Sequence, residues 1–143
     1  MKRVAVFVAG VAAVFGLAMA QNTRPGTAAG DRQEQIQRGK YLVHSVAMCI
    51  ECHTPRTPDG RLIEERLLQG APMPVDAPFP TQRWAYRAPQ IAGLPGWTFE
   101  DAVRFLETGE DPRGYRPAPP MPSYRLNRAD AEAVVLYLMS LKH

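Results

Sequence analysis

The sequence predicts a small all-α domain with long proline-rich loops. Three segments carry apolar residues at helical spacing, and no segment alternates apolar and polar residues for long enough to suggest a sheet. Thirteen of the fourteen prolines lie between Pro55 and Pro122. Proline lacks a backbone donor and disrupts helix interiors, so this middle part of the chain is expected to be mostly loop.

The N-terminal residues 1–20 have the layout of a cleaved signal peptide. Lys2 and Arg3 precede an apolar run that ends in Ala18-Met19-Ala20, a small-x-small cleavage pattern. The alternative is an uncleaved membrane anchor. Residues 4–20 would make a helix of only about 25 Å, against a hydrocarbon core of about 30 Å, so an anchor is marginal in length. We therefore expect export to the periplasm or to the outer face of the cytoplasmic membrane.

Cleavage would leave a flexible leader at residues 21–30 and one domain at residues 31–143. The 17 basic residues would fall to 15 against 14 acidic ones, a net charge of +1. The basic character of the precursor therefore comes partly from the signal peptide. We expect no nucleic-acid partner.

The first expected helix begins at Asp31, which forms a capping-box-like start with Glu34. Its buried stripe is expected to contain four residues at three- and four-residue spacing: Ile36, Gly39, Val43 and Val46. A glycine inside a helix costs about 1 kcal/mol relative to alanine. We interpret Gly39 as a point where another helix crosses closely.

Two further helices have clear boundaries. One is capped by Thr98 and ended by Gly109, and the other is capped by Asn127, with Asp130 near the positive end of its dipole. The expected apolar face of the first contains Phe99, Ala102, Val103 and Leu106. That of the second contains Ala131, Val134, Val135, Leu138 and Leu141. A weaker helical pattern spans residues 61–70.

The cluster "CIECH" places Cys49, Cys52 and His53 within five residues. A structural zinc site needs four ligands, and the sequence offers only His44 and His143 in addition. A redox disulfide of this spacing normally follows a strand, and no strand pattern precedes the cluster. Cys-x-x-Cys-His is also the attachment motif of covalent haem, and we favour this interpretation.

The haem interpretation also has a physical reason. Two thiols three residues apart on a helical turn can form thioethers to one porphyrin edge, and the adjacent imidazole then faces the iron. The apolar macrocycle would supply the core that a short, loop-rich chain lacks.

A haem iron held by His53 needs a ligand on its other face. Met121 and Met73 both lie in proline-flanked loops that can aim a side chain. Met121 is favoured because its loop leads directly into the last helix. Met73 lies only twenty residues after His53. The alternatives are Met73, a histidine or an open site. Four other candidates are less suitable because of their positions in the chain: Met48, Met139, His44 and His143.

Two tryptophans and two arginines could serve haem propionates. Trp97 and Trp84 are expected as donors, although a plain core role explains each of them equally well. Arg83 and Arg87 could offset the charge, although exposed arginines without such a role are the commoner explanation.

The motifs "CIECH", "PPMPSY" and "AEAVVLYLMSL" resemble those of the class I c-type cytochromes. The likeness covers residues 31–143 and is greatest to bacterial cytochromes that serve dehydrogenases and respiratory complexes. It implies that Gly39, with Tyr41 or Leu42, packs against Tyr137. The span of 68 residues from His53 to Met121 is long for the family because of an extra proline-rich loop at residues 71–95.

We therefore expect an electron-transfer protein rather than an enzyme, with one covalent haem c ligated by His53 and Met121. Its partner would be a redox protein or a membrane-bound respiratory or dehydrogenase complex. Membrane contact would come through that partner or through an uncleaved anchor. The alternatives are a permanent subunit of a respiratory, photosynthetic or dehydrogenase complex and, in a different class, a haem sensor or catalytic haem protein with an open distal site.

Overall fold

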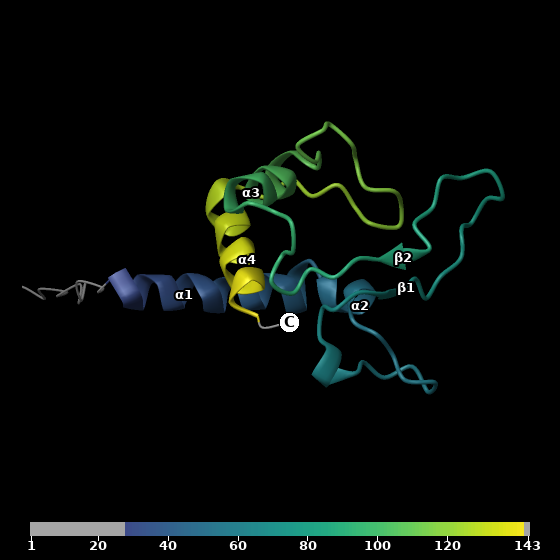
Figure 1. Cartoon of the computed structure of the whole chain (residues 1–143), viewed down its shortest axis with the longest axis horizontal. Helices are drawn as coiled ribbons and strands as arrows, with labels where there is room; N and C mark the ends of the chain where they lie inside the picture. Colours follow the sequence, from purple (N-terminus) through teal and green to yellow (C-terminus); the bar gives the residue numbers. More distant parts are fainter. Residues whose placement is uncertain (1–27, 142–143) are drawn as a thin grey trace, which may run out of the picture.

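Three helices dominate the computed structural model, which describes residues 28–141 (Figure 1). Helix α1 spans Ala28–Tyr41, α3 spans Phe99–Thr108 and α4 spans Arg128–Ser140. The shorter elements are the π-helical turn η1 (Leu42–Val46), helix α2 (Cys49–His53), the 3-10 turn η2 (Glu64–Arg66) and strands β1 (Ala71–Pro72) and β2 (Arg87–Ala88). The expected all-α class is confirmed.

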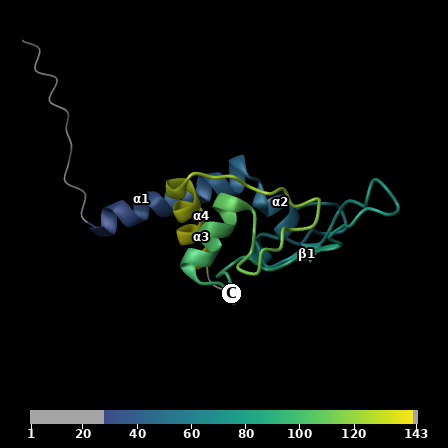
Figure 2. The same ribbon diagram turned by 90° about the horizontal axis from the view of Figure 1, so that it is seen from above.

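Helices α1 and α4 cross at Gly39 (Figures 1 and 2). A Cβ added at Gly39 would lie 1.9 Å from the carbonyl oxygen of Ala133 and 2.8 Å from Cβ of Tyr137. The close crossing predicted from the glycine is therefore confirmed. Leu42 and Tyr137 are buried at this crossing, whereas Tyr41 is 53% exposed. Of the two candidates on the first helix, Leu42 is the residue that packs in the core.

Two details of the first helix differ from the prediction. Helix α1 begins at Ala28, three residues before Asp31, so Asp31 lies in the first turn instead of capping the helix. Alanine is the best helix former, and an acidic residue in the first turn still favours the helix dipole. Val46 is 53% exposed, because the wider turn of η1 shifts the helical phase beyond Val43.

The caps of α3 and α4 were predicted correctly. The Thr98 side chain accepts a 3.1 Å hydrogen bond from the Asp101 amide, and the Asn127 side chain accepts one of 2.9 Å from the Asp130 amide. Gly109 ends α3 in the left-handed conformation. The predicted apolar faces lie in the core or pack against it: Phe99, Ala102, Val103 and Leu106 of α3, and Ala131, Val134, Val135, Leu138 and Leu141 at α4.

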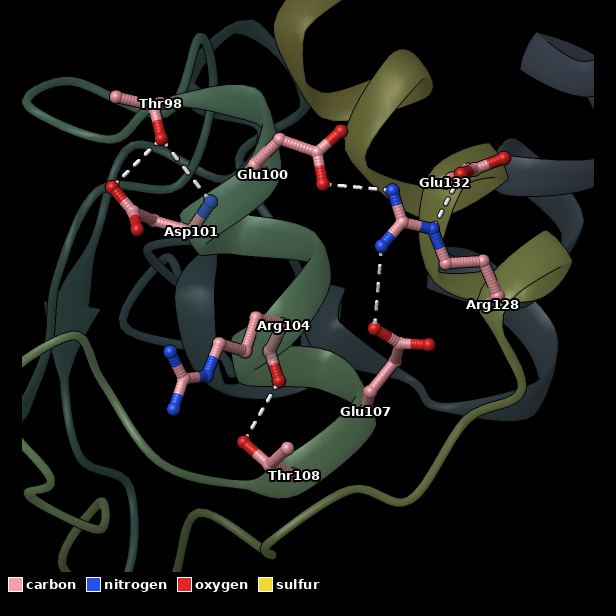
Figure 3. Close-up of polar contacts among 8 residues, drawn as sticks. All are labelled: Thr98, Glu100, Asp101, Arg104, Glu107, Thr108, Arg128 and Glu132. Carbon is pink, nitrogen blue, oxygen red and sulfur yellow. Dashed lines mark hydrogen bonds and ion pairs between the residues drawn. The ribbon is translucent and has the colours of Figure 1, made fainter.

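Arg128 joins the first turn of α4 to α3 (Figure 3). Its guanidinium lies 2.7 Å from a carboxylate oxygen of Glu100 and 3.8 Å from one of Glu107. It also pairs with Glu132 of its own helix at 2.7 Å. These contacts are exposed, so we expect them to orient the helices more than to stabilise them.

The predicted helix at residues 61–70 was wrong. Only Glu64–Arg66 form a single 3-10 turn. Leu68 is fully buried with a φ of 59°, and its amide donates to the Thr54 hydroxyl. Its carbonyl accepts from the amides of Ile91 and Ala92. Tertiary contacts at this one leucine therefore override the local helical pattern.

Strands β1 and β2 form a two-residue antiparallel ladder that the sequence pattern did not predict. The chain between them, residues 73–86, projects away from the helices, and we call it the arm (Figures 1 and 2).

The predictions of a signal peptide and an anchor lie outside the described residues, as does most of the expected leader. Within residues 28–141, no helix has both the length and the apolar character needed to cross a membrane.

Candidate haem site

Helix α2 brings the three residues of the sequence motif to one place. The chain leaves η1 through Met48, whose left-handed φ of 50° separates the two helical segments. Cys49 and Cys52 follow on a single helical turn and are free, partly buried thiols. Burial raises the pKa of the Cys49 thiol to about 11. His53 ends the turn and is only 4% exposed.

All three residues line a cavity of about 720 Å³. Its walls also come from the segment after β2, from α3, from the loop before α4 and from α4 itself. The apolar lining includes Leu94, Trp97, Phe105, Val134 and Leu138. The volume lies within the range of about 300–1,000 Å³ that small-molecule and cofactor sites occupy.

The His53 ring is fixed by the backbone. Its Nδ1 lies 2.7 Å from the carbonyl oxygen of Pro89. Because a carbonyl can only accept, Nδ1 carries the proton and Nε2 keeps a free lone pair. Burial lowers the pKa of His53, and the bond to Pro89 opposes that shift. The imidazole is therefore neutral near pH 7, the form that a metal ligand requires.

The structure narrows the choice of distal ligand. Met121 and Met73 both line the cavity, and so does Met48 beside Cys49. Met139 and His44 are not among the lining residues; His44 Nε2 instead lies 2.7 Å from the hydroxyl of Tyr137. His143 lies outside the described residues. In the described part of the chain, no group of three or more His, Cys, Asp or Glu side chains is arranged to hold a metal ion.

Of the four residues expected near the propionates, two line the cavity and two do not. Trp97 lines the cavity, with its ring centroid 5.4 Å from that of Phe105. Arg87 lines it as well. Trp84 is not among the lining residues, and its indole N–H donates to the Val75 carbonyl at 3.1 Å. The Arg83 guanidinium donates to the Arg116 carbonyl at 3.2 Å and is also absent from the lining.

Sequence reasoning missed two contributors. The Tyr124 hydroxyl donates to the Ala47 carbonyl at 2.8 Å, and the tyrosine ring lines the cavity. Burial, followed by the nearby Cys49 and Cys52, raises the pKa of Tyr124 to about 12. The position of Tyr124 three residues after Met121 was a usable signal. Pro89 acts through its carbonyl, so its side chain gave no signal.

A family model described as cytochrome c matches residues 36–142. The chain belongs to the cytochrome c family. This confirms the resemblance to class I c-type cytochromes, and the cofactor is a covalently bound haem c whose Cys-x-x-Cys-His motif Cys49 and Cys52 fit. The residues present suit such a group: two thiols, a neutral imidazole and a thioether reach one apolar cavity of cofactor size.

Two of the relatives are dehydrogenase cytochrome subunits, and a third is a diheme cytochrome. The chain is 33% identical over 115 residues to the fructose dehydrogenase cytochrome subunit of Gluconobacter japonicus, covering 73% of this chain and 21% of the relative. It is 33% identical over 90 residues to the cytochrome c subunit of the quinone alcohol dehydrogenase of Gluconacetobacter polyoxogenes. That match covers 59% of this chain and 18% of the relative. A diheme c-type cytochrome of Cereibacter sphaeroides is 44% identical over 45 residues, which cover 32% of this chain and 15% of the relative. The chain thus spans about a fifth of the length of these relatives.

Proposed function

We propose that this cytochrome is an exported carrier of single electrons in the periplasm or at the outer face of the cytoplasmic membrane. Cys49 and Cys52 would form the thioethers, and His53 and Met121 would be the axial ligands. The haem supplies the ferric–ferrous couple when bound. One observation carries the proposal: a buried His53, with its Nδ1 bonded to the Pro89 carbonyl, shares an apolar cavity with both thiols and with Met121.

The protein's own contribution is to hold its ligands in place through the redox change. Pro89 fixes the orientation of the His53 ring. A methionine thioether raises the reduction potential, and the apolar walls keep water away from the iron. Such a site transfers electrons without a substrate pocket or a proton-transfer group, so we propose no catalytic activity.

Backbone contacts support Met121 over Met73. The amide of Gly70 donates to the carbonyl of His53 at 2.8 Å, which ties the segment just before Met73 to the proximal histidine. The Met121 loop has no such bond to the His53 backbone among the described residues; the Ala85 amide donates to its Pro119 carbonyl, and the Tyr124 hydroxyl after it donates to the Ala47 carbonyl. A ligand on the face opposite His53 is more easily supplied by that second loop.

The names of the relatives suggest the kind of partner. Cytochrome subunits of a fructose and an alcohol dehydrogenase contain a region similar to this chain. We infer that the chain exchanges electrons with a dehydrogenase or a respiratory complex, and we propose no nucleic-acid partner. Residence in such a complex as a permanent subunit is the second candidate, and those names favour it. Membrane contact would come through the partner or through an uncleaved anchor.

Exposure of the ferrous holoprotein to carbon monoxide tests the proposal against a haem sensor or haem enzyme. A carrier whose iron has two protein ligands is expected to leave carbon monoxide unbound. Ready binding of carbon monoxide to the ferrous protein would show an open distal site and would support the sensor or catalytic alternative.

A further inference from the structure

The arm at residues 73–86 projects beside the cavity, and its Met73 and Ala85 line it. We propose that it is a bracket that positions Met121 by linking the distal methionine loop, residues 117–122, to the segment that holds His53. The inference rests on the proposed ligation of iron by Met121.

The two ends of the arm are fixed to the proximal side of the site. Just before β1, the Gly70 amide donates to the His53 carbonyl at 2.8 Å, and just after β2, the Pro89 carbonyl accepts from His53 Nδ1 at 2.7 Å. The ladder pairs Ala71 with Ala88, and the Met73 amide then donates to the Tyr86 carbonyl at 2.9 Å. The base of the arm therefore moves with the proximal histidine.

Hydrogen bonds also join the two sides of the arm along its length. The indole N–H of Trp84 donates across the arm to the Val75 carbonyl at 3.1 Å. Nearer the tip, the Gln82 amide donates to the Phe79 carbonyl at 3.1 Å. These bonds give a long exposed segment a defined shape even though Phe79 and Tyr86 are about two-thirds exposed, at 67% and 68%.

The distal methionine loop needs support from outside. Four of its six residues are proline, and proline has no N–H to donate: Pro117, Pro119, Pro120 and Pro122. Its internal support is one 3.3 Å bond from the Met121 amide to the Ala118 carbonyl. Carbonyl groups at and beside such a loop are left for donors on other segments.

The arm provides those donors. The Ala85 amide donates to the Pro119 carbonyl at 2.7 Å, two residues before Met121. The Arg83 guanidinium donates to the Arg116 carbonyl at 3.2 Å, at the entrance to the loop. One short hairpin thus contacts the His53 ring through Pro89 and the Met121 loop through Ala85. Loss of either distal bond is expected to let Met121 leave the iron more readily.

Imidazole, which competes with a methionine for ferric haem iron, provides the test. Two variants of the holoprotein each delete one donor: Ala85→Pro removes the amide N–H, and Arg83→Ala removes the guanidinium. Arg66→Ala is the matched control, an exposed arginine on η2 whose side chain has no hydrogen bond or ion pair within the described part of the chain. Imidazole affinity of the ferric protein and the methionine–iron charge-transfer band are measured for each, with thermal unfolding measured separately.

We expect imidazole to bind about fivefold more tightly to each arm variant than to the wild type, the factor that one hydrogen bond typically contributes. The Arg66→Ala protein should match the wild type. Imidazole binding is measured from the spectrum of the haem iron and therefore reports on the iron site itself. A variant that is merely less stable would have a lower unfolding temperature but an unchanged imidazole affinity. If Ala85→Pro does not accumulate as folded holoprotein, Arg83→Ala decides alone.

Wild-type affinity in Arg83→Ala and in any folded Ala85→Pro would overturn the bracket and leave the ligation by Met121 intact. A wild-type protein without a methionine–iron band would overturn both. The two failures are therefore distinguishable.

Discussion

The His53 ring and the Pro89 carbonyl, thirty-six residues apart in the chain, are joined by a 2.7 Å hydrogen bond. The bond leaves Nε2 as the nitrogen that can face a metal. Burial keeps the ring neutral by lowering its pKa. Cys49 and Cys52 line the same cavity. One helical turn therefore carries the residues for haem attachment and iron ligation, and one carbonyl orients the ligand.

Covalent attachment gives the first prediction. Wild-type protein should keep its haem on a denaturing gel, because thioethers survive unfolding. The Cys49→Ser and Cys52→Ser single variants should each retain haem through one bond, and the double variant should lose it. Haem staining of the gel checks this. Extraction of wild-type haem into acidic organic solvent would refute the covalent attachment.

The crossing of α1 and α4 gives a prediction about stability. Gly39→Ala should lower the free energy of unfolding by about 1–3 kcal/mol, because the new methyl group overlaps the Ala133 carbonyl. Gln37→Ala, at an exposed position on the same helix, is the control and should change stability by less than about 0.5 kcal/mol. Denaturant unfolding of both variants compares them. Equal stability would mean that the helices cross less closely than described.

His44 gives a prediction about pH. Burial, and to a lesser extent Lys40, lowers the pKa of His44 from its ordinary 6.5, so the unfolded chain binds this proton more readily than the folded protein does. The stability that comes from the lowered pKa of His44 is fully present above pH 6.5. It is lost as the pH falls through the pKa of His44 in the folded protein. His44→Gln should make the loss of stability between about pH 7 and pH 5 less steep, since glutamine does not titrate but can still bond to Tyr137. Denaturant unfolding at several pH values measures both slopes, and identical slopes would contradict the assignment.

Features set by local chemistry were predictable from the sequence. The Thr98 and Asn127 caps depend on residues three positions away, and a glycine inside an apolar helical stripe already indicated the close crossing at Gly39. The attachment motif is likewise contiguous. These predictions needed no knowledge of which segments meet in space.

Features set by distant contacts were not predictable. Leu68 is held by Thr54, Ile91 and Ala92, which local periodicity does not reveal, and a helix was wrongly expected around it. Pro89 acts through a carbonyl that every residue possesses. The choice between Met121 and Met73 also depends on tertiary structure, and both reach the cavity.

The central claim is that His53 and Met121 ligate the iron, and the visible and near-infrared spectrum of the ferric protein tests it most directly. Wild type and Met73→Ala should both show the sulfur–iron charge-transfer band near the red limit of the visible range. Met121→Ala should lose that band and have a lower reduction potential. A band that survives in Met121→Ala and disappears in Met73→Ala would contradict the account and assign the ligand to the arm.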